Sequence, residues 1–187
     1  MNRDPMDMKK DMLKTLVTKE ELEQIVARLG REITRDYKGK TPLMVAVLKG
    51  AFVFMADLVR QVDLPCSIDF MAVSSYGSGM TSSGRVKIVK DLDTNLEGKD
   101  VIIVEDILDS GVTLSHLIEM LRTRNPNSIR LCTLFDKPER HKVDIKPDYV
   151  GYVVPNEFIV GYGLDFDEIY RNYPEIGVLK PSVYEEN

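Results

Sequence analysis

The sequence predicts an α/β fold, a mostly parallel central sheet flanked by helices. Apolar runs of strand length alternate with segments of helical spacing along most of the 187 residues. One run, 101–104, is β-branched throughout and apolar on both faces, which is typical of a central strand covered by helices. A chain of this length buries roughly 70% of the surface that its unfolded form exposes, so it needs no disulfide or structural metal.

The first half of the chain begins with a predicted helix. Thr18 followed by Glu21 is a capping box, and apolar residues then recur at helical spacing until Gly39. Apolar runs bounded by turn residues indicate strands, with one more helical pattern between them. We expect strands over 43–48, 68–73 and 86–89, and a second helix over 52–62. The segment 74–85 is rich in serine and glycine and cannot contribute to a core.

The second half continues the alternation and then changes character. A strand over 101–104 is followed by a helix over 114–122 and a strand over 129–135. After Pro138 we expect two short strands, 149–154 and 158–161. The C-terminal part, about 149–187, is expected to cap the sheet, so residues 1–187 are predicted to form one domain.

Composition excludes several classes of protein. The 25 basic and 30 acidic residues give a net charge of −5, the wrong sign for a protein that coats nucleic acid. No run approaches the ~18 apolar residues of a membrane span, and residues 1–14 lack the apolar core of a signal peptide. Cys66 and Cys132 stand alone and are expected to be buried thiols. We therefore predict a cytoplasmic protein with no nucleic-acid or membrane partner.

The segment 101–113 contains the residues that most clearly indicate a functional site. Its apolar strand is expected to end in two carboxylates, Glu105 and Asp106, before a turn of Asp, Ser and Gly opens a helix. Ligands bind at the carboxyl ends of strands in open α/β sheets. Backbone N–H groups of such a turn, the helix N-terminus and the Thr113 hydroxyl would cradle a phosphate.

The acidic residues of this segment need a separate explanation. Glu105, Asp106 and Asp109 place three negative charges beside a site for an anion, and hydrogen-bond donors or a divalent cation must offset their repulsion. A ribose diol and Mg²⁺ would supply both. On these residues alone, a purely structural interpretation stays open, in which Asp109 and Ser110 cap the helix and the other two carboxylates are solvated.

The segment Val101 to Thr113 resembles the phosphoribosyl-pyrophosphate motif of the type I phosphoribosyltransferases. It has four apolar residues, Glu-Asp, two apolar residues, Asp-Ser-Gly, a variable residue and Thr. The resemblance covers about residues 15–180 and is greatest to the hypoxanthine-guanine branch. The other matching segments are Leu48-Lys49-Gly50, Ser75-Tyr76, Lys137, Phe158 to Asp165 and Arg171. It implies the type I phosphoribosyltransferase fold, with a small hood built from the chain ends.

The resemblance also implies a role for each matching residue. Glu105 and Asp106 would hold the ribose hydroxyls, directly or through Mg²⁺, and Asp109 would act as acid/base beside purine N7. Lys49 would follow a cis peptide bond, and Ser75 and Tyr76 would open a flexible lid over 74–85. The implied phosphoribosyl-pyrophosphate site is Lys49, Gly50, Glu105, Asp106, Asp109, Ser110, Gly111, Val112, Thr113 and Arg171. The implied purine site is Lys137, Phe158, Ile159 and Asp165, and the Mg²⁺ ligands are Glu105, Asp106 and Asp165.

The implied activity is purine salvage. Ribose 5-phosphate would pass from phosphoribosyl pyrophosphate to N9 of hypoxanthine or guanine with Mg²⁺ as cofactor, giving IMP or GMP and pyrophosphate. A homodimer or homotetramer is expected. Two alternatives stay open, a regulator of this fold that senses phosphoribosyl pyrophosphate and a xanthine-preferring enzyme. A nucleotide hydrolase is disfavoured, because the chain has no Walker loop and no Gly-x-Ser-x-Gly. His116 and His141 match no expected site and are predicted to lie on a helix surface and in a loop.

Overall fold

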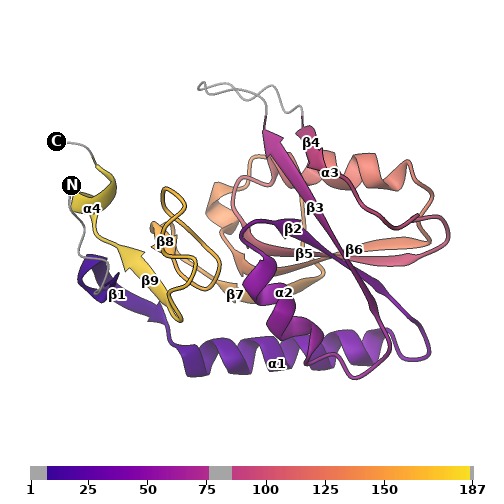
Figure 1. Ribbon diagram of the computed structural model, residues 1–187, viewed down its shortest axis with the longest axis horizontal. Helices are drawn as coiled ribbons and strands as arrows, with labels where there is room; N and C mark the ends of the chain where they lie inside the picture. Colours follow the sequence, from indigo (N-terminus) through magenta and orange to yellow (C-terminus); the bar gives the residue numbers. More distant parts are fainter. Residues whose placement is uncertain (1–7, 76–85, 186–187) are drawn as a thin grey trace.

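The computed structural model describes residues 8–75 and 86–185, which form a six-stranded sheet and a smaller three-stranded sheet (Figure 1). The strand order of the larger sheet is β4-β3-β2-β5-β6-β7, and every pairing except β3 with β4 is parallel. The α/β class with a mostly parallel sheet is thus confirmed. Its strands are β2 Leu43–Leu48, β3 Ser67–Ser75, β4 Val86–Lys90, β5 Asp100–Leu108, β6 Ser128–Asp136 and β7 Tyr149–Val153.

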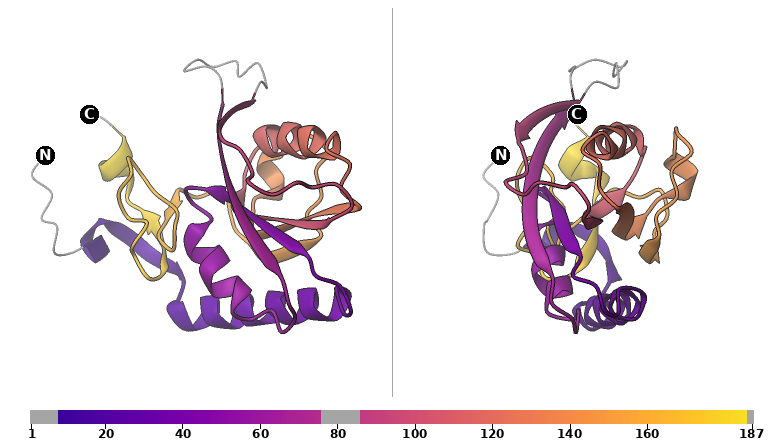
Figure 2. Two further views of the ribbon diagram at one scale, coloured as in Figure 1. Left: turned by 45° about the vertical axis from the view of Figure 1, so that its right-hand side comes forward. Right: turned by 90° about the vertical axis from the view of Figure 1, so that its right-hand side faces the viewer.

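Helices cover both faces of this sheet. Helices α1 (Lys19–Asp36) and α2 (Phe52–Val59) lie on one face, and α3 (Val112–Arg122) lies on the other (Figure 2). The capping box at Thr18 is present, as predicted. Helix α2 ends three residues before the predicted Val62. The central strands therefore bury apolar side chains in two cores, one under α1 and α2 and one under α3.

The chain ends form the expected hood. Strand β1 (Met12–Val17) pairs antiparallel with β9 (Ile176–Leu179), which pairs with β8 (Ile159–Val160). The 3-10 turn η1 (Met8–Asp11) precedes β1, and the short helix α4 (Pro181–Tyr184) follows β9 at the outer side of the hood (Figure 1). A small core of its own includes Tyr170 and Tyr173. Strand β1 was not predicted from the sequence, because Lys14 interrupts a six-residue segment.

The site lies where the strand order reverses. The chain leaves the carboxyl end of β2 toward β3 and leaves the carboxyl end of the neighbouring β5 toward β6, so these two connections run in opposite directions. One prediction needs correction here, because β5 does not end at Glu105 and Asp106. Its pairing with β6 continues to Leu108 opposite Asp136, so both carboxylates stand on the strand itself.

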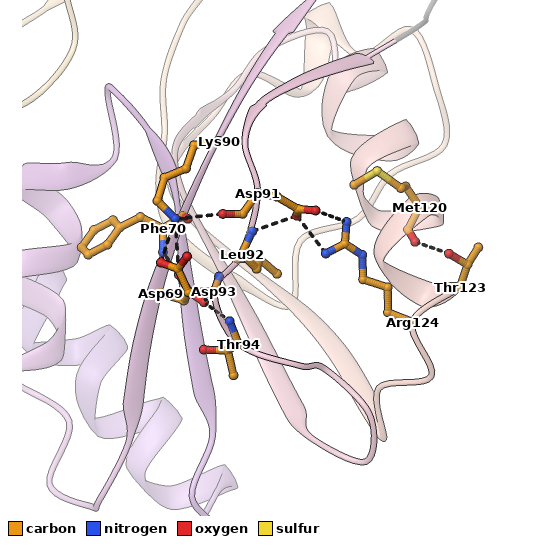
Figure 3. Close-up of polar contacts among 10 residues, drawn as sticks. All are labelled: Asp69, Phe70, Lys90, Asp91, Leu92, Asp93, Thr94, Met120, Thr123 and Arg124. Atoms are coloured by element: carbon orange, nitrogen blue, oxygen red, sulfur yellow. Dashed lines mark hydrogen bonds and ion pairs between the residues drawn. The ribbon is translucent and has the colours of Figure 1, made fainter.

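Polar contacts fasten the β3–β4 arm to the rest of the domain (Figure 3). Asp69, only 5% exposed on β3, accepts backbone hydrogen bonds from Phe70, Asp93 and Thr94 at 2.7, 3.0 and 2.8 Å. Asp91 pairs with both terminal nitrogens of Arg124, just beyond α3, at 2.8 and 3.0 Å. The base of the arm is therefore held to the far end of α3. Residues 76–85, most of the predicted lid, lie outside the described residues.

The cysteine prediction is partly wrong, whereas both histidine predictions are confirmed. Cys132 is buried, but Cys66 is partly exposed because it lies in the turn before β3. His116 lies on the surface of α3, as predicted. His141 is a loop residue, also as predicted, and its Nε2 lies 2.7 Å from Oδ1 of the buried Asp136. Within the described ranges, no helix has the length and apolar character needed to cross a membrane.

Candidate active site

Two adjoining cavities open at the carboxyl ends of β2 and β5, beneath the hood. The loop cavity has a volume of about 380 Å³, and the aromatic cavity has a volume of about 520 Å³. Asp106, Ile107, Asp109 and Asp165 line both cavities, so these residues mark their junction. The other polar residues of the loop cavity are Lys49, Glu105, Ser110, Thr113 and Arg171. The aromatic cavity is also lined by Lys137, Arg140, Asn156, Glu157, Phe158, Ile159, Leu164 and Tyr184.

The turn from β5 into α3 forms one wall of the loop cavity. Gly111 caps α3 in the left-handed conformation (φ 74°), and no side chain caps the helix there. A Cβ on Gly111 would lie 2.6 Å from Ile145 Cγ2, so space as well as φ requires glycine. The N–H groups that follow Val112 in the first turn and the positive end of the helix dipole suit an anion.

Two neighbouring carboxylates, the partly buried Glu105 and the buried Asp106, form another wall of the loop cavity. Burial, with the charge of neighbouring Asp106, raises the pKa of Glu105 well above its usual range. Burial also raises the pKa of Asp106, although hydrogen bonds to it act in the opposite direction. A methyl group on Gly50 would overlap the Asp106 carboxylate, which packs directly on the turn after β2. This pair is a place where a cation would relieve the cost of burying negative charge.

The donor set at this wall fits Mg²⁺ better than an ion that needs an all-protein cage. Among residues 8–75 and 86–185, no three His, Cys, Asp or Glu side chains gather as a metal site. Mg²⁺ usually keeps several waters and binds one or two carboxylates together with substrate phosphates. Asp165, the third expected ligand, pairs with Arg171 at 2.9 Å and accepts the N–H of Glu168 at 2.9 Å. Glu105 and Asp106 are thus the better placed of the three.

Basic side chains approach the loop cavity from two elements. The peptide bond between Leu48 and Lys49 is cis, as the family resemblance implied. Lys49 Nζ lies 3.0 Å from Glu168 Oε2, and the other oxygen of this carboxylate, Oε1, lies 3.3 Å from Arg171 Nη2. The Lys49 and Arg171 hydrogen bonds lower the pKa of Glu168. Arg171 Nε is buried and has no hydrogen-bond partner among the described residues, so it has a donor to offer an anion.

Asp109, at the junction of the cavities, is held by an ion pair. Its carboxylate accepts a hydrogen bond from Arg140 Nε, and Arg140 also reaches Asn156 Oδ1 at 3.4 Å. Arg140 belongs to the short 3-10 turn η2 (Pro138–Arg140), directly after Lys137. Arg140 was not predicted as a site residue, because no local sequence pattern places it opposite a carboxylate on another loop.

The aromatic cavity combines an ammonium group with flat apolar walls. Lys137 is 8% exposed, and its Nζ donates to the Glu157 carbonyl at 2.7 Å. Burial lowers the pKa of Lys137. Phe158 remains 39% exposed, and one face of its ring stacks on Tyr184, with centroids 4.8 Å apart and planes 19° from parallel. Tyr184 was also missed, since it lies in a tail that carries no recognisable pattern.

Most of the predicted site residues therefore meet at one place. One of the others, Val112, lines neither cavity. Val112 directs its N–H toward Ser110 Oγ at 3.4 Å, Ser75 ends β3, and Tyr76 lies outside the described residues. The predicted residues that do line a cavity are Lys49, Gly50, Glu105, Asp106, Asp109, Ser110, Gly111, Thr113, Lys137, Phe158, Ile159, Asp165 and Arg171.

Comparisons with known proteins agree with this architecture. Residues 12–167 match the family model of the phosphoribosyl transferase domain. The chain is 56% identical over 178 residues to a hypoxanthine-guanine phosphoribosyltransferase of Bacillus subtilis, covering 95% of this chain and 99% of that protein. A crystal structure of a hypoxanthine phosphoribosyltransferase from Staphylococcus aureus superimposes with a TM-score of 0.95 at 48% identity, covering 98% of this chain and 100% of that one.

Some relatives are much longer. The chain is 54% identical over 179 residues to a protein of Listeria monocytogenes named bifunctional protein TilS/HprT. The matched region is 96% of this chain but only 28% of that protein. The family match, the near-complete coverage of the shorter relatives and the shared fold lead to one conclusion: the chain belongs to the phosphoribosyl transferase family, in its group of bacterial hypoxanthine-guanine phosphoribosyltransferases.

Proposed function

We propose that this chain transfers ribose 5-phosphate from phosphoribosyl pyrophosphate to N9 of hypoxanthine or guanine, giving IMP or GMP and pyrophosphate in purine salvage. The observation that carries the proposal is that the anion-binding loop cavity and the aromatic cavity share Asp106, Asp109 and Asp165. Two such different reactants, one highly charged and one flat, would meet at these residues. The family and the names of the relatives support the same reaction.

The loop cavity would hold phosphoribosyl pyrophosphate. The 5′-phosphate would take the backbone N–H groups of Asp109 to Thr113, while Lys49, the backbone of Gly50 and Arg171 would bind the pyrophosphate. Glu105 and Asp106 would hold the ribose hydroxyls. Mg²⁺, held by these two carboxylates and in a second position by Asp165, would neutralise charge on the departing pyrophosphate.

The aromatic cavity would hold the base. Lys137 has only donors to offer, so it suits the 6-oxo group of hypoxanthine or guanine and opposes the 6-amino group of adenine. Phe158 would stack on the ring, the backbone of Ile159 would bind its edge, and the Asp165 carbonyl would face the 2-position. These contacts would hold N9 against the ribose, which is how orientation accelerates a two-substrate reaction.

Asp109 would move the purine proton. Asp109 lies at the junction of the two cavities, and its ion pair with Arg140 holds the side chain in that position. When the base enters, one Asp109 oxygen would face N7 while Arg140 holds the other side of the group. Proton transfer by a group so placed typically contributes ~10²–10⁴-fold to rate.

Three further expectations belong to this proposal. Residues 74–85, opened by Ser75 and Tyr76, would close over the reacting centre and exclude water from a cation-like transition state. The working form would be a homodimer or homotetramer in the cytoplasm. The choice among hypoxanthine, guanine and xanthine would be set in the aromatic cavity.

A panel of purines tests the proposal. The protein is incubated with phosphoribosyl pyrophosphate, Mg²⁺ and hypoxanthine, guanine, xanthine or adenine, and nucleotide formation is followed by ultraviolet absorbance. We expect IMP and GMP, and none in excess chelator. Tight binding of phosphoribosyl pyrophosphate without nucleotide formation from any base would instead favour a regulator, and faster turnover of xanthine than of the other bases would identify a xanthine-preferring enzyme.

A further inference from the structure

We infer that Tyr184 is a positioning residue for the base. Its ring supports Phe158 from behind and holds that ring parallel to the incoming purine. The inference rests on the proposed function of the aromatic cavity and assigns a role there to the C-terminal helix α4, for which the sequence carried no signal.

The spacing of the two rings shows where the base can lie. Their centroids are 4.8 Å apart and their planes are nearly parallel. A base between them would need two stacked contacts of ~3.5–4 Å each, or about 7 Å between the rings. The base therefore does not enter between Phe158 and Tyr184 as they stand, and it stacks on the other face of Phe158.

The arrangement of the elements agrees with this order of layers. Ile107 and Lys137 line the aromatic cavity from the carboxyl ends of the large sheet, whereas Phe158 and Tyr184 line it from the hood. Helix α4 lies on the side of β8 and β9 that faces away from the large sheet (Figures 1 and 2). In the proposed arrangement the purine would lie between the sheet end and Phe158, and the Tyr184 ring, which also borders the aromatic cavity, would cover the other face of Phe158.

The backbone ties Tyr184 to Phe158 independently of the rings. Leu179, the last residue of β9, donates its N–H to the Phe158 carbonyl at 2.8 Å. Lys180 donates to Asp11 at 3.0 Å, and Val183 donates to Lys180 at 2.9 Å, which folds the chain back over Phe158. The position of the Tyr184 ring is therefore set by the hood sheet.

Two aromatic contacts orient the Phe158 ring. Phe158 precedes a strand of only two residues, β8, and is 39% exposed. Phe166 contacts it edge-on, with centroids 5.7 Å apart and planes at 86°. The parallel face contact comes from Tyr184. A stacked aromatic pair is worth enough to change an equilibrium constant by roughly 2- to 10-fold.

Steady-state kinetics of two Tyr184 variants test the inference. Tyr184→Leu removes the flat ring, and we expect the KM for hypoxanthine and guanine to rise roughly 3- to 10-fold while the KM for phosphoribosyl pyrophosphate and kcat change by less than about twofold. Tyr184→Phe keeps the ring and is expected to restore the base KM. Tyr152→Leu, an exposed tyrosine on the edge strand β7, is the matched control.

A double-mutant cycle separates positioning from general loosening of the tail. If Tyr184 acts through Phe158, Tyr184→Leu adds little to the base KM in a Phe158→Leu background. Additive effects would overturn the inference, as would an unchanged or lowered base KM in Tyr184→Leu. Equal increases in both KM values together with a lowered thermal midpoint would also overturn it, because they describe a purely structural residue.

A spectroscopic measurement gives a readout that does not need turnover. The chain has no tryptophan, so Phe158→Trp creates a single reporter at the base site. We expect GMP to quench its emission, and Tyr184→Leu in that background to shift the emission and weaken GMP binding. If the unaltered protein forms no nucleotide, the proposed function is contradicted. If the protein is active but Tyr184→Leu changes neither the Phe158→Trp emission nor its titration with GMP, only this inference is contradicted.

Discussion

The loop cavity and the aromatic cavity touch, yet they are built on different principles. The loop cavity is made of backbone and charge, with glycines where any side chain would collide and an uncapped helix end that offers N–H groups. The aromatic cavity is made of side chains, among them a buried ammonium group and the two stacked rings of Phe158 and Tyr184. The first therefore depends on the path of the chain, and the second depends on which side chains fill a given space.

This difference predicts how each cavity responds to change. Backbone N–H groups bind any phosphate of the right shape, so the loop cavity provides binding energy with little choice between bases. Side chains such as Lys137 and Phe158 can be exchanged without moving the backbone, so selectivity resides in the aromatic cavity. Substitutions in the loop cavity are expected to abolish activity, whereas those in the aromatic cavity alter which base is used.

The largest effect is expected at Gly50. A methyl group there would overlap the Asp106 carboxylate, so Gly50→Ala must displace either the turn after β2 or Asp106. Displacements of this size near reacting groups cost ~10²-fold or more in rate. We expect kcat/KM for phosphoribosyl pyrophosphate to fall at least about 100-fold.

Gly98→Asn is the control for that substitution. Gly98 has a φ of 68° and open space around it, in the turn before β5, and Asn tolerates this conformation. Near-normal activity of Gly50→Ala would show that the loop cavity accepts side chains, and the comparison of the two cavities would then lose its basis.

The second-largest effect is expected at Asp109, which lies at the junction of the two cavities. Asp109→Asn keeps the shape of the side chain but cannot accept the purine proton, so kcat is expected to fall by ~10²–10⁴-fold. Binding of phosphoribosyl pyrophosphate, measured by calorimetry, should change far less, because it depends on the backbone of the loop. Asp144→Asn, on an exposed loop residue, is the control. A decrease in kcat of less than about threefold would contradict the acid/base role.

Lys137 tests whether selectivity resides in the aromatic cavity. Lys137→Met removes the ammonium group and keeps an unbranched apolar side chain, so we expect kcat/KM for hypoxanthine and guanine to fall by about 10- to 100-fold, as for a lost charged hydrogen bond of ~1.5–3 kcal/mol. The KM for phosphoribosyl pyrophosphate should stay nearly constant. Efficient use of adenine by the unaltered protein would contradict this assignment.

Because the pKa of Lys137 is lowered, both the KM for hypoxanthine and the free energy of unfolding are expected to depend on pH. The ammonium form is present below that pKa and is lost above it, so the KM for hypoxanthine should rise with pH earlier than an ordinary lysine would allow. The same shift means that the unfolded chain binds this proton more tightly than the folded protein. The contribution of Lys137 to the free energy of unfolding therefore increases with pH. Absence of the early KM rise in the unaltered protein would exclude a charged Lys137 as the contact.

The two cavities also differ in how far the sequence predicts them. The loop cavity follows from one contiguous segment, Val101 to Thr113, whose residue types and spacing already indicate a strand, a turn and a helix. The aromatic cavity is assembled from separate segments, and its partners Arg140 and Tyr184 meet Asp109 and Phe158 only in the folded chain. Local patterns carry no information on such contacts, which is why these two residues were missed.

The errors in the predicted elements have the same origin. Strand β5 was predicted too short because Glu105 and Asp106 are poor strand residues when judged alone, whereas pairing with β6 keeps them extended. Strand β1 was missed because its partner, β9, lies at the other end of the chain. Pairing with strands distant in the sequence thus determines both the length of β5 and the presence of β1.

The smallest effect is expected at the far end of α3, where Asp91 pairs with Arg124 (Figure 3). The hydrogen bond from Arg124 lowers the pKa of Asp91. This contribution to stability is present above the pKa of an unfolded aspartate, ~3.9, and is lost as pH falls through the lower folded value. Both side chains are partly exposed, so Asp91→Asn should lower the free energy of unfolding by only about 0.5–1 kcal/mol at neutral pH.

Urea denaturation at neutral and strongly acidic pH measures this contribution. The difference between Asp91→Asn and the unaltered protein should disappear once Asp91 is protonated in both states. Glu23→Gln, which removes the exposed Lys19 pair at 4.0 Å, is the control and should change little at either pH. Activity should be unaffected, because the pair holds the end of α3 that lies away from the loop cavity. A loss of turnover in Asp91→Asn would instead show that this cavity depends on the whole length of α3, and not only on the turn that begins it.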